Sequence, residues 1–177
     1  MLCYHGGGLR NDRHLPWRVY GEVPAELPSA RAHWFVFRYD GPSIPPTDIV
    51  PSLAEKVASL QFDARRRGIQ LAIDSPPPSL PEFATFLQKV KAALPPAIDF
   101  SITTLLDWFR PSTALAAVIQ EVDEFVPRFY DVLNPNDDRS DSAIAAPFDA
   151  ASLNPVFQRF KRRFLIGIST WLRRTPQ

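Results

Sequence analysis

Hydrophobic and polar positions along the chain follow two periods, one typical of strands and one typical of helices. Short apolar runs that end at Asp, Gly or Pro indicate buried strands. Longer segments with an apolar residue every three or four positions indicate amphipathic helices. Strands are predicted at 33–39, 69–74, 98–104, about 122–130 and 164–168, with a sixth within 17–23. Helices are predicted at 52–68, 79–94 and 112–120, with a short one from residue 154.

Two of these helix starts carry a Ser and a Glu three residues apart, the pattern of a capping box. The pairs are Ser52 with Glu55 and Ser79 with Glu82. The first helix is expected to close at the arginine run 65–67, because cations complement the negative end of a helix dipole. Phosphate binding by these arginines is the less favoured alternative, and the same two interpretations apply to the basic run 161–163.

The alternation of strands and helices predicts right-handed βαβ units and a parallel sheet. In strand 69–74, Leu71 and Ile73 form an apolar face, whereas Gln70, Ala72 and Asp74 form a polar or small one. A doubly wound sheet needs two apolar faces, but a barrel needs only one. A complete barrel has eight strands and typically about 250 residues. Five or six predicted strands are therefore too few for a complete barrel. The prediction is an α/β, partial TIM-barrel-like fold with parallel strands and outer helices.

Length and composition indicate how the chain is divided into domains. A chain of 177 residues with 45% hydrophobic and 22% charged positions can bury one sizeable core. Residues 1–30 are expected to be an N-terminal extension with one strand, and residues 31–177 an incomplete barrel domain. The 19 prolines fall mostly in connections. A truncated remnant of a longer barrel enzyme is an alternative interpretation.

Charge and motifs exclude several functional classes. A net charge of +1 gives no field that would attract nucleic acid. Cys3 is the single cysteine, and His5, His14 and His33 lack metal-binding spacing, so no metal and no cofactor are expected. Neither a nucleotide-binding glycine motif nor a Gly-x-Ser-x-Gly elbow is present. Without a signal peptide or a membrane-spanning run, the chain as given is expected to be soluble and not exported, and its oligomeric state is left open.

Acidic residues mark the ends of the predicted strands. Asp40, Asp74, Asp107 and Asp131 lie at or just beyond strand C-termini, which parallel strands bring to one rim. Paired carboxylates at such a rim are the groups that glycosidases use. Asp74 is the preferred proton donor, with Asp40 or Asp107 as its partner. The alternative is that each acid only ends a turn or caps a loop.

Four further residues are candidates for substrate binding. Trp108 and Tyr130 can stack against sugar rings, Arg38 can steer a carboxylate, and Asp131 adjoins Tyr130. The alternative is that the aromatic residues pack in the core or simply end a strand.

Several segments carry a family resemblance, namely 68–77, 80–94, 101–108, 122–126 and 163–171. With them, the chain from about residue 34 to residue 171 resembles a bacterial family known as domain of unknown function 3142. That family is regarded as similar to TIM-barrel glycoside hydrolases. The resemblance therefore implies a barrel-like fold and a sugar-related ancestry.

The alternate positions Gln70, Ala72 and Asp74, with the later pair Tyr130 and Asp131, resemble a pattern in chitinase-like glycosidases of family eighteen. That pattern implies an inward-facing general acid at Asp74. Ala72 stands where those enzymes have the carboxylate that orients the substrate acetamide, and Gln70 also replaces an acid. Hydrolysis assisted by the substrate is therefore not expected.

The leading hypothesis is a glycoside-hydrolase-like protein that acts on or binds a polysaccharide by carboxylate acid–base chemistry. The rival hypothesis is a non-catalytic carbohydrate-binding or scaffold module. Loss of glycan hydrolysis in Asp74→Asn favours the first, and saturable glycan binding without turnover favours the second.

Overall fold

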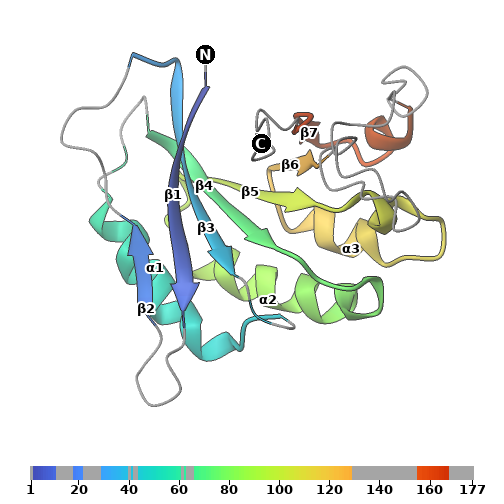
Figure 1. The fold of residues 1–177 in the computed structure, drawn as a ribbon, viewed down its shortest axis with the longest axis horizontal. Helices are drawn as coiled ribbons and strands as arrows, with labels where there is room; N and C mark the ends of the chain where they lie inside the picture. Colours follow the sequence, from blue (N-terminus) through green and yellow to red (C-terminus); the bar gives the residue numbers. More distant parts are fainter. Residues whose placement is uncertain are drawn as a thin grey trace, which may run out of the picture.

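The computed structural model describes residues 2–10, 18–21, 29–39, 41, 44–60, 62, 66–128 and 155–167. Within these residues, seven strands form one sheet in the order β2-β1-β3-β4-β5-β6-β7 (Figure 1). The strands are β1 (Leu2–Arg10), β2 (Arg18–Gly21), β3 (Ala32–Tyr39), β4 (Arg66–Ile73), β5 (Asp99–Thr104), β6 (Glu124–Pro127) and β7 (Arg163–Phe164).

The spatial order of the strands follows their order in the chain, with β2 as the exception. Every neighbouring pair from β1 and β3 to β6 and β7 is parallel, and β2 pairs antiparallel with β1. A doubly wound sheet reverses its direction of winding at one point, whereas a TIM barrel does not. The predicted α/β, barrel-like fold with parallel strands is therefore confirmed. Among the described residues the sheet is open, with β2 and β7 at its edges.

Helices follow the strands and lie together against the sheet (Figure 1). Among them are α1 (Val50–Ser59), α2 (Leu80–Ala93) and α3 (Leu115–Gln120), with the 3₁₀ turns η1 (Thr47–Ile49), η2 (Pro77–Ser79) and η3 (Leu106–Phe109). Residues 155–158 are also helical, as the sequence predicted. Both α1 and α2 have a proline in the first turn, where its fixed φ suits the helix and its missing N–H costs nothing. The predicted helix 79–94 corresponds closely to α2.

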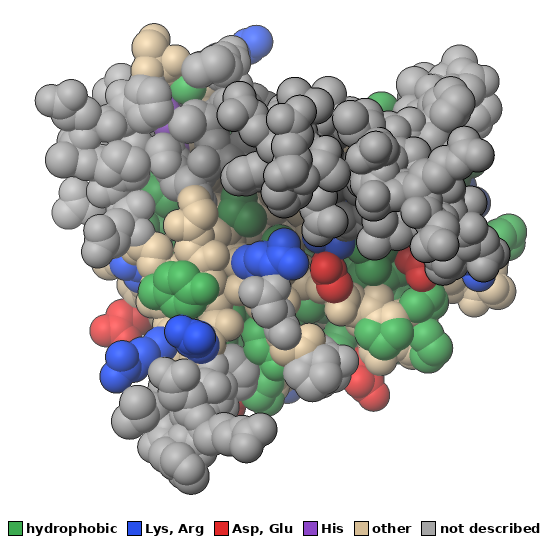
Figure 2. All heavy atoms as spheres, in the orientation of Figure 1, with side chains coloured by type: hydrophobic (Ala, Val, Ile, Leu, Met, Phe, Trp, Pro, Cys, Tyr) green, Lys and Arg blue, Asp and Glu red, His purple; other side chains and the backbone are tan. Residues whose placement is uncertain are grey.

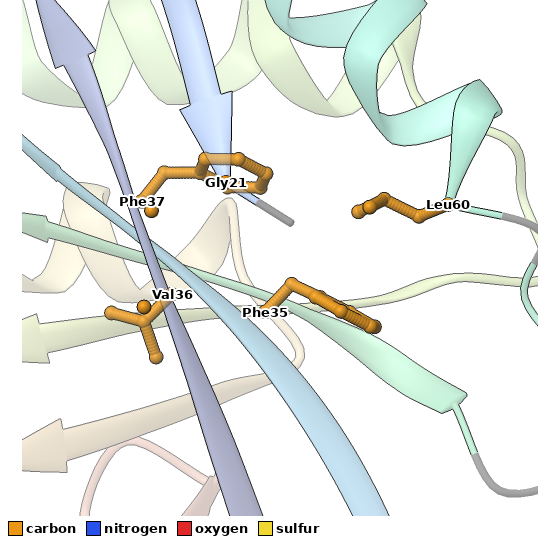
Figure 3. A pocket seen from close by; sticks show the side chains of 7 residues that line it. Gly21, Phe35, Val36, Phe37 and Leu60 are labelled. Atoms are coloured by element: carbon orange, nitrogen blue, oxygen red, sulfur yellow. The ribbon is translucent and has the colours of Figure 1, made fainter. Parts of the chain in front are cut away.

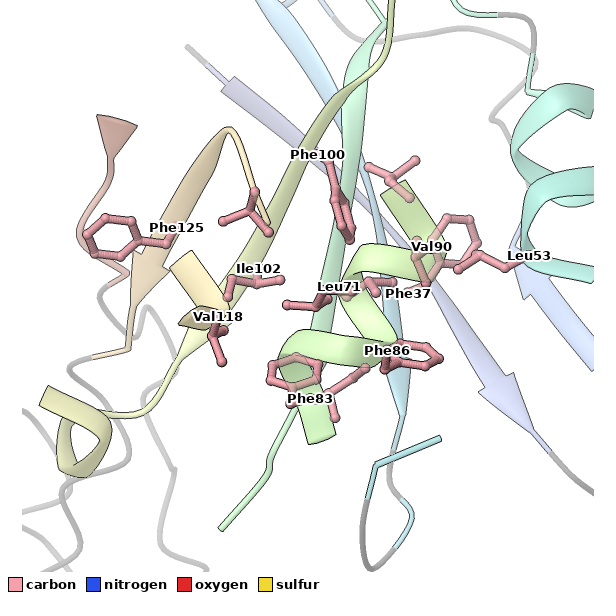
Figure 4. Packing of buried hydrophobic residues seen from close by; sticks show 14 of the residues in the cluster. Phe37, Leu53, Leu71, Phe83, Phe86, Val90, Phe100, Ile102, Val118 and Phe125 are labelled. Carbon is pink, nitrogen blue, oxygen red and sulfur yellow. The ribbon is translucent and has the colours of Figure 1, made fainter. Parts of the chain in front are cut away.

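The core lies between this helical layer and one face of the sheet (Figure 4). Strand side chains at alternate positions meet the inner faces of the helices. The sheet contributes Phe37, Leu71, Phe100, Ile102 and Phe125, and the helices contribute Leu53, Phe83, Phe86, Val90 and Val118, all of them buried. Burial of apolar surface on this scale, at about 25 cal/mol per Å², is the main force that holds the helices to the sheet.

The opposite face of the sheet is mixed in character, as the sequence predicted. By register, Val36, Gln70, Ser101 and Glu124 lie side by side on β3 to β6. Gln70, Ser101 and Glu124 are buried, and Gln70 Nε2 donates a hydrogen bond of 3.1 Å to Ser101 Oγ. A polar row of this kind suits the interior of a barrel.

The prediction that the arginine run 65–67 closes a helix is wrong. Helix α1 ends at Ser59, and Arg66 and Arg67 begin β4. Arg67 Nε donates to Asp99 Oδ2 on β5 at 2.5 Å, so pairing across the sheet decides the conformation here. The local helical pattern carries no information about a partner strand.

The capping boxes are also absent, because neither α1 nor α2 has a side-chain hydrogen bond at its N-cap. A 3₁₀ turn precedes each helix and places Ile49, not Ser52, at the cap of α1. Helix α3 begins after Ala114 rather than at Ser112. Backbone bonds of the 3₁₀ turns, such as Leu80 N–H to Pro77 O, already engage amides at these starts.

The described part of the first 30 residues includes two strands, β1 and β2, where the sequence indicated one within 17–23. Strand β1 includes the run Gly6-Gly7-Gly8, which has no apolar and polar alternation to reveal it. Glycine is needed at position 7, because a Cβ there would lie 2.5 Å from the backbone oxygen of Tyr20 on β2.

The last two strands are shorter than predicted. Strand β6 ends at Pro127, which has no N–H to donate to a ladder, and β7 has only two residues. One further bridge, between Arg128 and Gly167, continues the pairing.

Candidate functional site

Asp74 lies directly after β4 at the carboxyl-terminal edge of the sheet. Its Oδ1 is 2.7 Å from Nη2 of Arg128, which directly follows β6. The Asp74 side chain is 46% exposed, whereas that of Arg128 is 5% exposed. Strand β5 lies between β4 and β6, so this ion pair spans three neighbouring parallel strands at one edge.

The ion pair decides what Asp74 can do. A guanidinium is always charged in proteins, and a buried one needs an anionic partner. In the pair the Asp74 carboxylate is an acceptor, and its exposed surface can accept further hydrogen bonds from hydroxyl groups. To act as a proton donor, Asp74 would have to carry its proton beside the charged guanidinium of Arg128.

Asp107 is brought toward the same edge by η3, which follows β5. The neighbouring Trp108 donates an indole hydrogen bond of 2.8 Å to the backbone oxygen of Ser75, the residue after Asp74. This bond holds η3 against the segment that follows β4. Asp107 is partly buried, and its Oδ1 is buried without a hydrogen-bond partner among the described residues.

Trp108 is completely buried. Its ring packs edge-on against Phe83 of α2, with centroids 5.8 Å apart. No ring face is left on which a sugar could stack, and the place of Trp108 fits the alternative considered from the sequence, a packing residue.

Arg38 is exposed near the end of β3. By register it pairs with Ala72, and Asp74 is the next residue of the β4 segment on that face. Arg38 therefore lies on the same edge as the Asp74–Arg128 pair, as its predicted role requires.

Asp40, Tyr130 and Asp131 lie outside the described residues. The predicted pairing of Asp74 with Asp40 and the predicted roles of Tyr130 and Asp131 stay predictions.

Arg128 was not predicted as a site residue. A signal for it exists, because Glu124, Val126 and Arg128 occupy alternate positions of the predicted strand 122–130 and so share one face. A charged residue at the end of such a face is placed at the rim. Its partner could not be read from the sequence, since strand order was not known.

A small apolar hollow lies between the first strands and the end of α1 (Figure 3). It is lined by Gly6, Gly7, Gly21, Phe35, Val36, Phe37 and Leu60. None of these side chains can exchange a proton or carry a charge, so this hollow offers no catalytic chemistry.

Charges of both signs are mixed on the surface. On the face seen in Figure 2, Lys and Arg side chains adjoin Asp and Glu side chains near the middle of the view. Among the described residues no group of three or more His, Cys, Asp or Glu side chains could hold a metal ion. Within the same residues, no helix has the length and apolar character needed to cross a membrane.

Comparisons with known proteins give a family and a fold. A family described as "Domain of unknown function (DUF3142)" matches residues 29–171. The chain resembles the crystal structure of the Bacillus cereus spore cortex-lytic enzyme SleL, with a TM-score of 0.50 and 15% sequence identity. The match covers 76% of this chain and 34% of SleL, so the chain spans about a third of the length of that enzyme. No match is found among curated proteins.

Proposed function

The chain belongs to the DUF3142 family, and we propose that it is a glycoside-hydrolase-like domain that binds a polysaccharide at the carboxyl-terminal edge of its sheet. The observation that carries this proposal is the ion pair of Asp74 and Arg128 at that edge. It presents an oriented, half-exposed carboxylate that can accept bonds from sugar hydroxyls. In barrel folds the same edge is where substrates bind.

Hydrolysis at this edge would need one carboxylic acid that carries a proton and one carboxylate. The sequence favoured Asp74 as the proton donor, but its bond to Arg128 suits the carboxylate role better. Asp107, whose Oδ1 has no partner among the described residues, is then the better candidate for the donor, and Asp40 is the other. Arg38 would bind the substrate at the same edge.

The fold comparison supports the class of activity. SleL is described as a cortex-lytic enzyme, and this chain resembles about a third of it. We extend to this chain only the expectation of a glycan ligand.

A non-catalytic carbohydrate-binding module is the second candidate. The binding module is favoured by the ion pair with Arg128, which already engages the Asp74 carboxylate. It is also favoured by the two residues that precede Asp74 on the same strand face. Gln70 is bonded to Ser101, and Ala72 has no polar group. Neither can orient a substrate as a carboxylate would.

The test is a panel of polysaccharides assayed for both hydrolysis and binding, with wild type, Asp74→Asn, Asp107→Asn and the control Glu55→Gln on the exposed side of α1. If the domain is an enzyme, both aspartate variants should lose about 100-fold or more in turnover, the usual effect of removing a general acid or base. The control should match wild type.

Saturable binding by wild type without turnover, weakened in Asp74→Asn, would select the binding module. Absence of both binding and hydrolysis across the panel, or equal behaviour of Asp74→Asn and Glu55→Gln, would contradict the proposal.

A further inference from the structure

A second charged site lies at the opposite, amino-terminal edge of the sheet. There the structure has an open cavity of about 390 Å³, lined by Trp34, Arg67, Glu124, Arg162, Arg163, Phe164 and Leu165. Glu124 and Arg163 are the first residues of β6 and β7, and Arg67 is the second of β4. Because these strands are parallel, the cavity is at the other end of the sheet from Asp74.

The arginines of this cavity are held in place by neighbouring groups. Asp99 Oδ2 accepts from Arg67 Nε at 2.5 Å and from Arg163 Nη2 at 3.0 Å. Arg162 Nη2 donates to the backbone oxygen of Gln120 at 3.2 Å. Each of these bonds engages only part of the five N–H donors of a guanidinium. The remaining donors are pre-positioned, which reduces the entropy lost when a ligand binds.

Glu124 lies among these arginines and is 6% exposed. Its Oε1 is buried and has no hydrogen-bond partner among the described residues. A buried polar atom without a partner costs free energy, and a bound ligand with a matching group would recover it. Burial raises the pKa of the Glu124 carboxyl; Arg67 acts in the lowering direction and Asp99 in the raising direction. The protonated carboxyl can donate a hydrogen bond to an anion.

The balance of charge selects the ligand. Three guanidinium groups face the two carboxyl groups of Asp99 and Glu124, so the cluster is net cationic. Guanidinium groups bind carboxylates and phosphates through paired hydrogen bonds. The volume is in the range of small-molecule sites, roughly 300–1,000 Å³. Trp34, Phe164 and Leu165 add apolar surface for the body of such a molecule.

We propose that this cavity binds a small organic molecule through its oxyanion group, a phosphate or a carboxylate, held by Arg67, Arg162 and Arg163 with Glu124 as a further hydrogen-bonding group. This site is separate from the proposed glycan edge and does not depend on it. Phosphate binding by the basic runs 65–67 and 161–163 is the less favoured interpretation of the sequence. It gains support because the fold places Arg67, Arg162 and Arg163 around one cavity.

The experiment is calorimetric titration of the full chain with inorganic phosphate and with D-glucuronate, which separate the two sources of oxyanion. D-glucose and sodium chloride at matched ionic strength are the controls. Saturable binding of at least one oxyanion is expected, with no binding of glucose. Arg162→Gln and Arg163→Gln should each weaken it by about tenfold or more, as expected for a lost charge-assisted hydrogen bond.

Arg110→Gln is the matched control variant, because Arg110 is exposed and follows η3 at the other edge of the sheet. It should bind the oxyanion like wild type. Within the described part of the chain, the Arg162 side chain donates to a backbone oxygen and pairs with no carboxylate, so Arg162→Gln should keep the fold, and circular dichroism checks this. Glycan binding at the Asp74 edge should not change in Arg162→Gln.

Glu124→Gln tests the role of the carboxyl with D-glucuronate, whose carboxylate stays ionised above the ordinary pKa of a glutamate. The charged groups that face Glu124 are Arg67 on β4, Asp99 on β5 and the arginines at 162 and 163. As pH rises through the raised pKa of Glu124, its carboxylate repels the ligand, so wild-type affinity should fall. In Glu124→Gln this fall should disappear, and above the pH at which wild-type affinity has fallen the variant should bind at least about threefold more tightly than wild type.

Two results would overturn the proposal. One is the absence of saturable binding of either oxyanion above the ionic-strength control. The other is equal oxyanion affinity in wild type, Arg162→Gln and Arg163→Gln, all correctly folded. In either case the arginine cluster would have only a structural role, which is to hold the amino-terminal ends of the strands together.

Discussion

At the scale of single residues, Glu124 shows how burial couples protonation to stability. Its pKa is raised by burial, so between the ordinary value and the raised one the folded state keeps a proton that the unfolded state has lost. The free energy of unfolding therefore falls as pH rises through this window, and the cost is complete above it.

Glu124→Gln should remove that cost. The difference in unfolding free energy between variant and wild type should grow in favour of the variant from about pH 4 to pH 8, by on the order of 1 kcal/mol for each unit of raised pKa. Urea unfolding at both pH values measures this. Identical pH profiles for the two proteins would contradict it.

Trp108 gives a second residue-scale prediction. Trp108→Ala should lower the free energy of unfolding by about 3–5 kcal/mol, because it opens a cavity in the core and removes the bond to Ser75. Urea unfolding of Trp108→Ala and Trp108→Phe measures the effect, with Phe keeping most of the volume. A Trp108→Ala variant with unchanged stability and weakened glycan binding would instead restore the role of a sugar platform.

The site residues divide by whether a local pattern can reveal them. Asp74 could be placed at the rim from the sequence, because a buried run followed by an acid and prolines marks the end of a strand. Its partner Arg128 could not, because the contact depends on two strands that are distant in the chain and have β5 between them. The burial of Trp108 likewise depends on its contact with α2. The sequence predicts this helix but not where it packs.

At the scale of elements, glycines decide how closely neighbouring strands approach. A Cβ at Gly68 of β4 would overlap the backbone oxygen of Asp99 on β5, whereas a Cβ at Gly6 of β1 would meet nothing within 4 Å. The two positions therefore make a matched pair.

Gly68→Ala should cost about 2 kcal/mol or more of unfolding free energy, because the backbone of β5 must move. Gly6→Ala should be neutral or stabilise by up to about 1 kcal/mol, because alanine restricts the unfolded chain. Chemical denaturation of both variants measures this. Equal changes in unfolding free energy for Gly68→Ala and Gly6→Ala would mean that β4 and β5 can move apart without loss of stability.

The elements with strong periodic patterns were the ones that could be predicted. Strand 98–104 and helix 79–94 match β5 and α2 within about a residue, because the packing of one apolar face into the core dictates both patterns. Strand β1 escaped prediction since its glycines carry no pattern, and the arginines of β4 were assigned to a helix since their partner Asp99 is distant in the sequence.

At the scale of the whole molecule, the pair of Asp74 and Arg128 connects strands that are not neighbours. A double-mutant cycle with Asp74→Asn and Arg128→Gln should give a coupling free energy of about 1 kcal/mol, above that of most exposed pairs because the guanidinium is buried. Urea unfolding of the four proteins measures it. Additive effects of the two substitutions would show that the pair contributes nothing to holding β4 and β6 together.

The order of the sheet has a consequence for how the protein is made. Each parallel strand lies beside the parallel strand synthesised just before it, so as a new strand leaves the ribosome its partner is already present. Pairing can then advance in the direction of translation, as each new parallel strand docks on the one made before it. Nascent chains halted after β4, β5 or β6 should therefore gain protease resistance in steps.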